Sequence, residues 1–351
     1  MVRRATAVSL ACLLAAGLIP PLPDGSAAGA GAALRSGGRA GGSVRGGQHA
    51  EQHPRHHAGQ HAEYRAGHPA GQHAEPRAGR HAEPHTGQRP MPGPARAPVP
   101  RSPKPEDVAK VVGELGRRLA GVTPPTHITV PTRVHVIASG PDRQVSEETV
   151  KAQIEVLNAA YAGKFGGVDT GVRFRLDTIS VRRSAAWFTD PVGNEKVMKK
   201  ALHEGGADTL NLYIAQLSEL MLGFASYPYW YAGAPALDGV VIDWRSLPGG
   251  AMTNYNQGFT GVHEIGHWLG LFHTFENGCR EPGDGIDDTP AEARPTEACP
   301  QDKDTCADRP GKDPAHNFMD YAHDRCMWEF TAGQAHRMHE MWAAFRASSA
   351  T

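Results

Sequence analysis

Residues 263–273 read His263-Glu264-Ile265-Gly266-His267-Trp268-Leu269-Gly270-Leu271-Phe272-His273, an uninterrupted H-E-x-x-H-x-x-G-x-x-H pattern. On a helix, side chains four positions apart lie on one face, so His263 and His267 can present imidazole nitrogens to one ion. A third ligand on the same helix would rotate out of reach. Gly270 has no Cβ and lets the chain leave the helix sharply, which brings His273 round to the ion. The spacing predicts a three-histidine metal site.

Three histidines leave one tetrahedral position of a zinc ion open to water, as in catalytic rather than structural sites. Glu264 is placed to accept a proton from that water, because the metal lowers the water's pKa from about 16 toward 7. A chance match on an amphipathic helix could explain H-E-x-x-H alone, but the added Gly and His make it rare. The motif predicts a zinc peptidase with Glu264 as general base.

The first hundred residues differ in composition from the rest. Residues 1–28 comprise a basic N-terminus, an apolar run and a cleavage site of small residues. This pattern predicts a secretory signal peptide. Residues 29–103 hold almost no large apolar side chains and are expected to be disordered. Nine histidines lie there, so weak metal capture is the alternative to a solvated linker. The catalytic domain is expected over 104–351, with 104–124 left open as a pro-segment or linker.

The charges and apolar runs exclude two classes of partner. From residue 104 onward, 24 basic residues stand against 32 acidic ones, so the folded part is not expected to bind nucleic acid. After the signal, no stretch approaches the roughly 20 apolar residues that cross a bilayer. We therefore expect a secreted, extracellular monomer without stable membrane anchoring.

Four cysteines follow the signal peptide: Cys279, Cys299, Cys306 and Cys326. In an oxidising compartment an even set predicts two disulfides, and three connectivities are open. A second metal site is the alternative, but the spacing contains no C-x-x-C pair.

Hydrophobic periodicity predicts interleaved helices and strands. Helices are expected at Asp107–Leu119 and from Ser146, as N-cap, to Tyr161. Strands are expected at Ile128–Ile137, weakened at Pro131, and at Val172–Ile179, Leu210–Ile214, Leu222–Ala225 and Gly239–Asp243. The interleaving predicts an α+β fold in which helices pack on a mixed sheet.

Downstream, residues 317–321 read Asn-Phe-Met-Asp-Tyr. Alone, Met319 would be interpreted as core filler, but after an extended zinc motif it indicates a Met-turn beneath the metal. With HEIGHWLGLFHTF at 263–275, DGIDDTP at 284–290, and the segments 222–225 and 239–243, the chain resembles the pappalysin family of metzincin peptidases. The resemblance covers about Val130 to Met341.

The resemblance implies a metzincin catalytic domain: a twisted mixed sheet with an active-site helix and a backing helix, then a C-terminal subdomain with the Met-turn. Tyr321 would stabilise the transition state or contact the zinc. The segment that would pair with an extended substrate comprises Leu222, Gly223, Phe224 and Ala225.

The family's calcium loop falls on Asp284, Asp288 and Thr289, although a surface turn explains these residues as well. The family's disulfides would join Cys279 to Cys306 and Cys299 to Cys326. Some relatives silence their zymogen with a prosegment cysteine, and that route is excluded here because no cysteine lies between Cys12 and Cys279.

The expected function is therefore that of a secreted zinc endopeptidase acting on extracellular proteins and peptides. The alternative is a catalytically silent binding module with the zincin fold. Such a module would have no need of Glu264, which is present.

Overall fold

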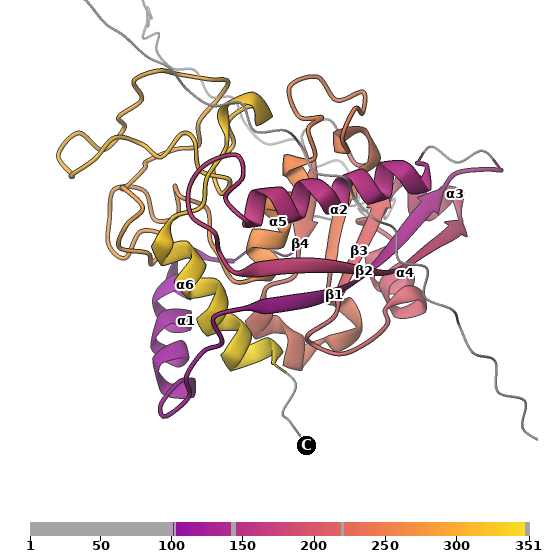
Figure 1. Ribbon diagram of the computed structural model, residues 1–351, viewed down its shortest axis with the longest axis horizontal. Coiled ribbons are helices and arrows are strands. Elements are labelled where there is room, and N and C mark those ends of the chain that lie inside the picture. Colours follow the sequence, from indigo (N-terminus) through magenta and orange to yellow (C-terminus); the bar gives the residue numbers. More distant parts are fainter. Residues whose placement is uncertain (1–100, 102, 142–144, 219–220, 348–351) are drawn as a thin grey trace, which may run out of the picture. The chain divides into compact units, whose positions relative to one another are not determined.

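Figure 1 shows the computed structural model, which describes residues 101, 103–141, 145–218 and 221–347. The predicted signal peptide and nearly all of the low-complexity segment lie outside these residues. In the described part, no helix is long and apolar enough to span a membrane.

A five-stranded sheet with the order β2-β1-β3-β5-β4 forms the centre of the domain. Its strands are β1 (Ile128–Ala138), β2 (Val172–Arg183), β3 (Leu210–Ala215), β4 (Gly223–Ala225) and β5 (Val240–Asp243). All neighbours are parallel except β4, which runs antiparallel to β5 with Gly223 opposite Ile242. The mixed sheet confirms the predicted α+β class, and β4 forms one of its edges.

The described residues contain six α-helices: α1 (Pro105–Arg118), α2 (Glu147–Tyr161), α3 (Ala185–Thr189), α4 (Glu195–Leu202), α5 (Phe259–Trp268) and α6 (Ala332–Met341). A π-helical turn, η5 (Trp342–Arg346), follows α6. Short 3-10 turns are η1 (Pro228–Gly233), η2 (Pro235–Leu237), η3 (Trp244–Ser246) and η4 (Asp324–Cys326).

Alternate side chains of β3 are buried on opposite faces of the sheet. Leu212 and Ile214 of β3 join the main core, where α2 and α5 pack against the sheet and each other (Figure 1). Tyr213 and Ala215 point the other way, toward the short helices α3 and α4. The period of two thus gives β3 a helix layer on each side.

The element predictions hold, with shifted ends. Pro131 does not interrupt β1, since pairing with β3 begins only at Thr132 and Pro131 pairs with β2 alone. The first helix starts two residues early, at Pro105, which suits a first helical position because proline lacks an N–H. The short helices α3 and α4 were not predicted.

Helix α1 belongs to the folded core. Val108, Val111 and Leu115 are buried against Tyr227 and Phe272.

Between α5 and α6 the chain forms no regular element except η4. Two disulfides join Cys279 to Cys306 and Cys299 to Cys326, the pairs that the family resemblance implies.

Candidate metal centre and cleft

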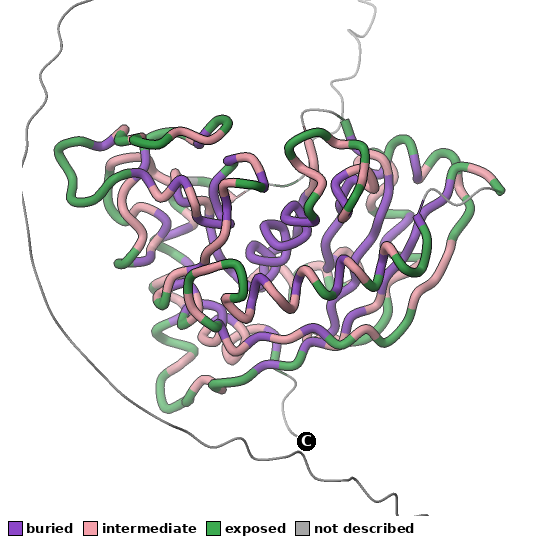
Figure 2. The backbone as a smooth tube through the Cα atoms, turned by 45° about the horizontal axis from the view of Figure 1, so that its top comes forward, coloured by how far each residue is buried: buried purple, intermediate pink, exposed green. Residues whose placement is uncertain are grey.

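Helix α5 carries the first two histidines of the motif through the interior of the domain. All ten of its residues are buried, and Figure 2 shows it as a continuously buried coil. After Trp268 the chain turns at Gly270, whose φ is +99°. A Cβ there would lie 2.4 Å from Met341 Cγ, so this turn requires glycine both for its conformation and for space. The turn directs the chain back to His273.

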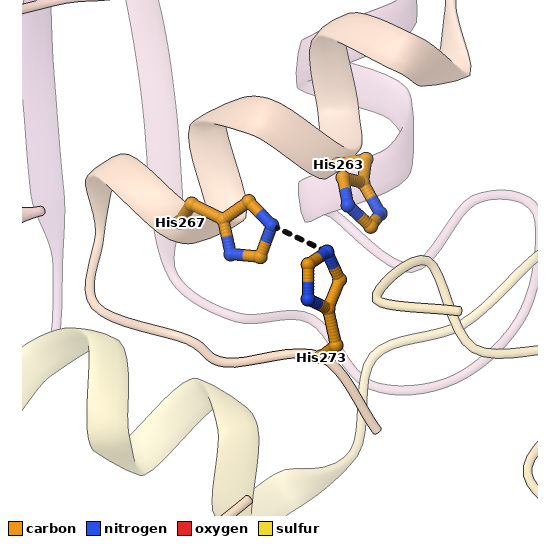
Figure 3. Close-up of side chains that lie close together, drawn as sticks. All are labelled: His263, His267 and His273. Carbon is orange, nitrogen blue, oxygen red and sulfur yellow. Dashed lines mark hydrogen bonds between the residues drawn. The ribbon is translucent and has the colours of Figure 1, made fainter. Parts of the chain in front are cut away.

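The three histidines meet at one point. Figure 3 shows His263 and His267 on the helix and His273 on the following loop, and their ligand atoms all lie within 4.8 Å of one another. His267 Nε2 and His273 Nε2 are 3.1 Å apart. Two nitrogens bound to a tetrahedral zinc would be separated by about 3.3 Å. The spacing therefore fits a zinc ion.

Hydrogen bonds fix the tautomers of the two helical histidines. His263 Nδ1 lies 2.7 Å from the Phe318 carbonyl oxygen, and His267 Nδ1 lies 2.8 Å from that of Leu271. A carbonyl oxygen only accepts, so each Nδ1 carries the proton and each Nε2 keeps its lone pair for a metal.

Burial also keeps the three rings neutral. It lowers the pKa of His263 to about 4, and the pKa values of His267 and His273 fall well below the usual range for the same reason. Metal binding requires neutral imidazole, so the ligands are already in the competent form at neutral pH. In the described part of the chain, they are the one group of three or more His, Cys, Asp or Glu side chains whose ligand atoms converge.

Glu264 lies against the edge strand β4. Burial raises the pKa of its carboxyl group to about 8. A Cβ on Gly223 would lie 2.5 Å from Glu264 Cγ and 2.8 Å from its Oε1. Only glycine at position 223 therefore leaves room for Glu264 in this conformation.

Met319 and Tyr321, predicted as the Met-turn residue and a catalytic residue, lie close to the residues of the zinc motif. Met319 is fully buried, and a Cβ on Gly266, between the two helical ligands, would lie 2.4 Å from its sulfur. The Tyr321 hydroxyl is 3.0 Å from His273 Nε2, on the ligand side of that ring. Tyr321 is 46% exposed, but partial desolvation of its hydroxyl group raises the pKa of the phenol, so it keeps its proton.

The three histidines, Glu264 and Tyr321 line one cleft of about 490 Å³. It brings together predicted residues from three segments: Leu222, Gly223, Phe224, Ala225, His263, Glu264, His267, His273 and Tyr321.

The predicted calcium ligands lie elsewhere and have protein partners. Both carboxylate oxygens of Asp284 are 2.8 Å from Thr289 Oγ1. Asp288 accepts hydrogen bonds from Thr331 Oγ1 and from the backbone N–H of Gly333, at the start of α6. Calcium binding by these residues stays a prediction.

Asp324 and Tyr227 are polar residues of the cleft that the sequence did not predict as site residues. The Asp324 carboxyl group is buried; its Oδ2 accepts from the Gln257 N–H at 2.7 Å, whereas its Oδ1 has no hydrogen-bond partner. The Tyr227 hydroxyl lies 2.9 Å from His267 Nδ1. No spacing or motif marks either residue, because only the tertiary fold brings them to the cleft.

Comparison with known proteins agrees with this geometry. Residues 195–343 match the model of the peptidase family described as pregnancy-associated plasma protein-A. An extracellular metalloprotease of Arthroderma benhamiae is 40% identical over 234 residues, which cover 65% of this chain and 76% of the relative. An extracellular metalloprotease of Verticillium alfalfae is 41% identical over 240 residues, which cover 67% of this chain and 83% of the relative.

Two solved structures share the fold. Mature mirolysin of Tannerella forsythia, in complex with a cleaved peptide, is 27% identical with a TM-score of 0.55, over 63% of this chain and 97% of that one. A promirolysin mutant of the same organism is 26% identical with a TM-score of 0.59, over 68% and 87%.

Proposed function

Since this chain belongs to the pappalysin family of metalloendopeptidases, we propose that it is secreted, holds zinc on His263, His267 and His273, and cleaves extracellular proteins and peptides. The observation that carries the proposal is the meeting of three neutral imidazoles with Glu264 in one cleft. Three nitrogen ligands with a fourth position open are the donor set of catalytic zinc.

The edge strand supports an extended peptide as substrate. β4 borders the cleft and pairs with β5 on one side. A peptide chain could add to its other side by main-chain hydrogen bonds. We propose that residues 222–225 hold the substrate in this way beside Glu264.

Each catalytic side chain has a separate task. Bound zinc would supply Lewis-acid chemistry, polarising the peptide carbonyl and lowering the pKa of water. Burial raises the pKa of Glu264, but the positive charge of bound zinc would lower it again and leave the side chain ionised. Glu264 would then take a proton from the attacking water and return it to the nitrogen of the leaving amine. Tyr321 keeps its phenolic proton and donates a hydrogen bond to the carbonyl oxygen as negative charge develops there.

The decisive experiment measures cleavage of casein and a mixed peptide library, with and without a zinc chelator, beside Glu264→Ala. We expect chelation to abolish cleavage, zinc to restore it, and the folded variant to be inactive. If metal-loaded protein cleaves nothing across the library, the silent binding module becomes the better explanation.

We further propose that the protein acts as a monomer and that the mature form retains α1. Light scattering and the N-terminal sequence of the secreted protein test these two points. Calcium at Asp284, Asp288 and Thr289 is tested by metal analysis after dialysis.

A further inference from the structure

A lysine ammonium lies inside a cage of oxygen atoms in the loop region between α5 and α6. Lys303 Nζ contacts Glu292 Oε1 at short range and lies 3.1 Å from Asp313 Oδ2. It also lies 3.0 Å from Thr296 Oγ1 and 2.6 Å from the Arg294 carbonyl oxygen. Both carboxylate side chains are fully buried, and the lysine is 13% exposed. Carboxylate, hydroxyl and carbonyl oxygens form the kind of set that surrounds a hard metal cation.

One side of the cage reaches the third histidine. The second oxygen of Glu292, Oε2, accepts a 2.7 Å hydrogen bond from Thr274 Oγ1. Thr274 directly follows His273 and is itself buried. The orientation of Glu292 therefore fixes the backbone next to a metal ligand.

The other side of the cage reaches the Met-turn. The Thr296 N–H donates to Asp320 Oδ1 at 2.8 Å, and the same oxygen accepts from the Tyr321 N–H at 2.7 Å. Thr296 Oγ1 contacts both Lys303 and Glu292. A single ammonium thus stands between the segments that carry His273 and Tyr321.

This arrangement matters because neither segment is part of a helix or strand. Their positions depend on side-chain contacts, and the cage holds more carboxylates than cations. Removing the ammonium would leave two buried carboxylates uncompensated, which is strongly destabilising in a protein interior.

We propose that Lys303 is a positioning residue whose ammonium serves as a built-in cation, ordering Glu292, Thr274 and hence His273 at the metal site. The inference rests on the proposed zinc peptidase function. Partners that orient metal ligands typically alter metal affinity or activity by about 10- to 100-fold when they are removed.

The test compares Lys303→Ala with Lys312→Ala, a matched control in the same loop. Lys312 pairs with Asp302 at the surface, and its side chain is 65% exposed. We measure zinc affinity by chelator competition, kcat, KM and Tm. We expect Lys303→Ala to lower zinc affinity and kcat at least about tenfold and the control to match the wild type. Zinc affinity and kcat within twofold of the wild type would overturn the proposal, even with a lowered Tm.

A second variant keeps the proposal testable if Lys303→Ala does not fold. Thr274→Val removes only the hydroxyl that links Glu292 to the ligand segment. We expect weaker zinc binding with a smaller loss of Tm than in Lys303→Ala, because only one hydrogen bond to Glu292 is lost. Unchanged zinc affinity would refute the link. An inactive wild type that still binds zinc would count against the peptidase function, but not against these affinity differences.

A calcium titration tests the built-in cation itself. In Lys303→Ala the vacated space keeps its oxygen ligands, which suit calcium. We expect millimolar calcium to raise the Tm of this variant more than that of the wild type or Lys312→Ala. Equal shifts in all three proteins would contradict the role assigned to the ammonium.

Discussion

At the scale of single residues, Gly223 sets the position of Glu264. A Cβ at position 223 would lie 2.5 Å from Glu264 Cγ, so Gly223→Ala must push the carboxylate away. General-base catalysis contributes about 10²- to 10⁴-fold, and we expect kcat to fall at least about tenfold with Tm nearly unchanged. Gly233→Ala is the control, because a Cβ there would meet nothing within 4 Å. Wild-type kcat in Gly223→Ala would show that Glu264 tolerates displacement.

The buried carboxyl group of Asp324 should make the stability of the protein depend on pH. Burial raises the pKa of its carboxyl group from 3.8 to about 6. Between these pH values the folded protein keeps a proton that the unfolded chain releases, so stability falls as pH rises. The loss approaches about 3 kcal/mol at pH 7. We expect Asp324→Asn to gain stability relative to the wild type as pH increases from 4 to 6, measured by denaturant unfolding at each pH. A constant difference would show that Asp324 titrates normally.

The same carboxylate should influence substrate choice. At neutral pH, Asp324 carries a buried negative charge in the wall of the cleft. This charge would attract a lysine or arginine side chain of a substrate bound in the cleft. We expect kcat/KM for peptides with basic residues near the cut to fall at least about tenfold in Asp324→Asn, and neutral peptides to be affected little. Equal losses for both peptide classes would argue against charge recognition.

At the scale of elements, the end of α5 is held by a buried ion pair. Arg346 and Asp238 are fully buried and in contact at 3.1 Å. Arg346 Nε also donates to the carbonyl oxygen of Trp268, the last residue of α5, at 2.8 Å. Breaking such a pair leaves an uncompensated charge, so Arg346→Met should lower the free energy of unfolding by about 3–5 kcal/mol.

The control for Arg346→Met is a surface ion pair on β2 between Arg175 and Asp177, in which the arginine side chain is 60% exposed. Arg175→Ala should lower the free energy of unfolding far less than Arg346→Met, because water screens a surface ion pair. Similar losses in the two variants, measured by urea unfolding, would mean that the pair behind α5 contributes no more than a surface contact.

How well a part of the fold could be predicted from the sequence depends on the type of element. Strands β1 and β2 show alternating apolar residues in the sequence, and the α5 motif has fixed ligand spacing, so these strands and the histidine cluster could be placed in advance. The segment between α5 and α6 has no period to detect. Its order comes from disulfides and buried charges such as Lys303 with Glu292, whose partners are set by tertiary contacts alone.

At the scale of the whole molecule, the fold should begin at α1. Residues 29–103 hold almost no apolar side chains, so a chain starting at Lys104 should keep the Tm and cleavage activity of the full chain. Deleting residues through Gly121 also removes the buried Val108, Val111 and Leu115. At about 1.5–2 kcal/mol each, this costs roughly 5 kcal/mol and exposes the core beneath Tyr227, which contacts His267.

The protein with the longer deletion should therefore have a lower Tm and a lower zinc affinity than the full chain. The protein with the shorter deletion should match the full chain in both. Thermal unfolding and chelator competition on the two truncated proteins separate these outcomes. If the chain without α1 matches the full chain in both measurements, residues 104–124 are a dispensable linker, and the domain boundary lies at β1. If the shorter deletion already lowers Tm, the segment before Lys104 contributes to the fold, and its composition is a poor guide to its role.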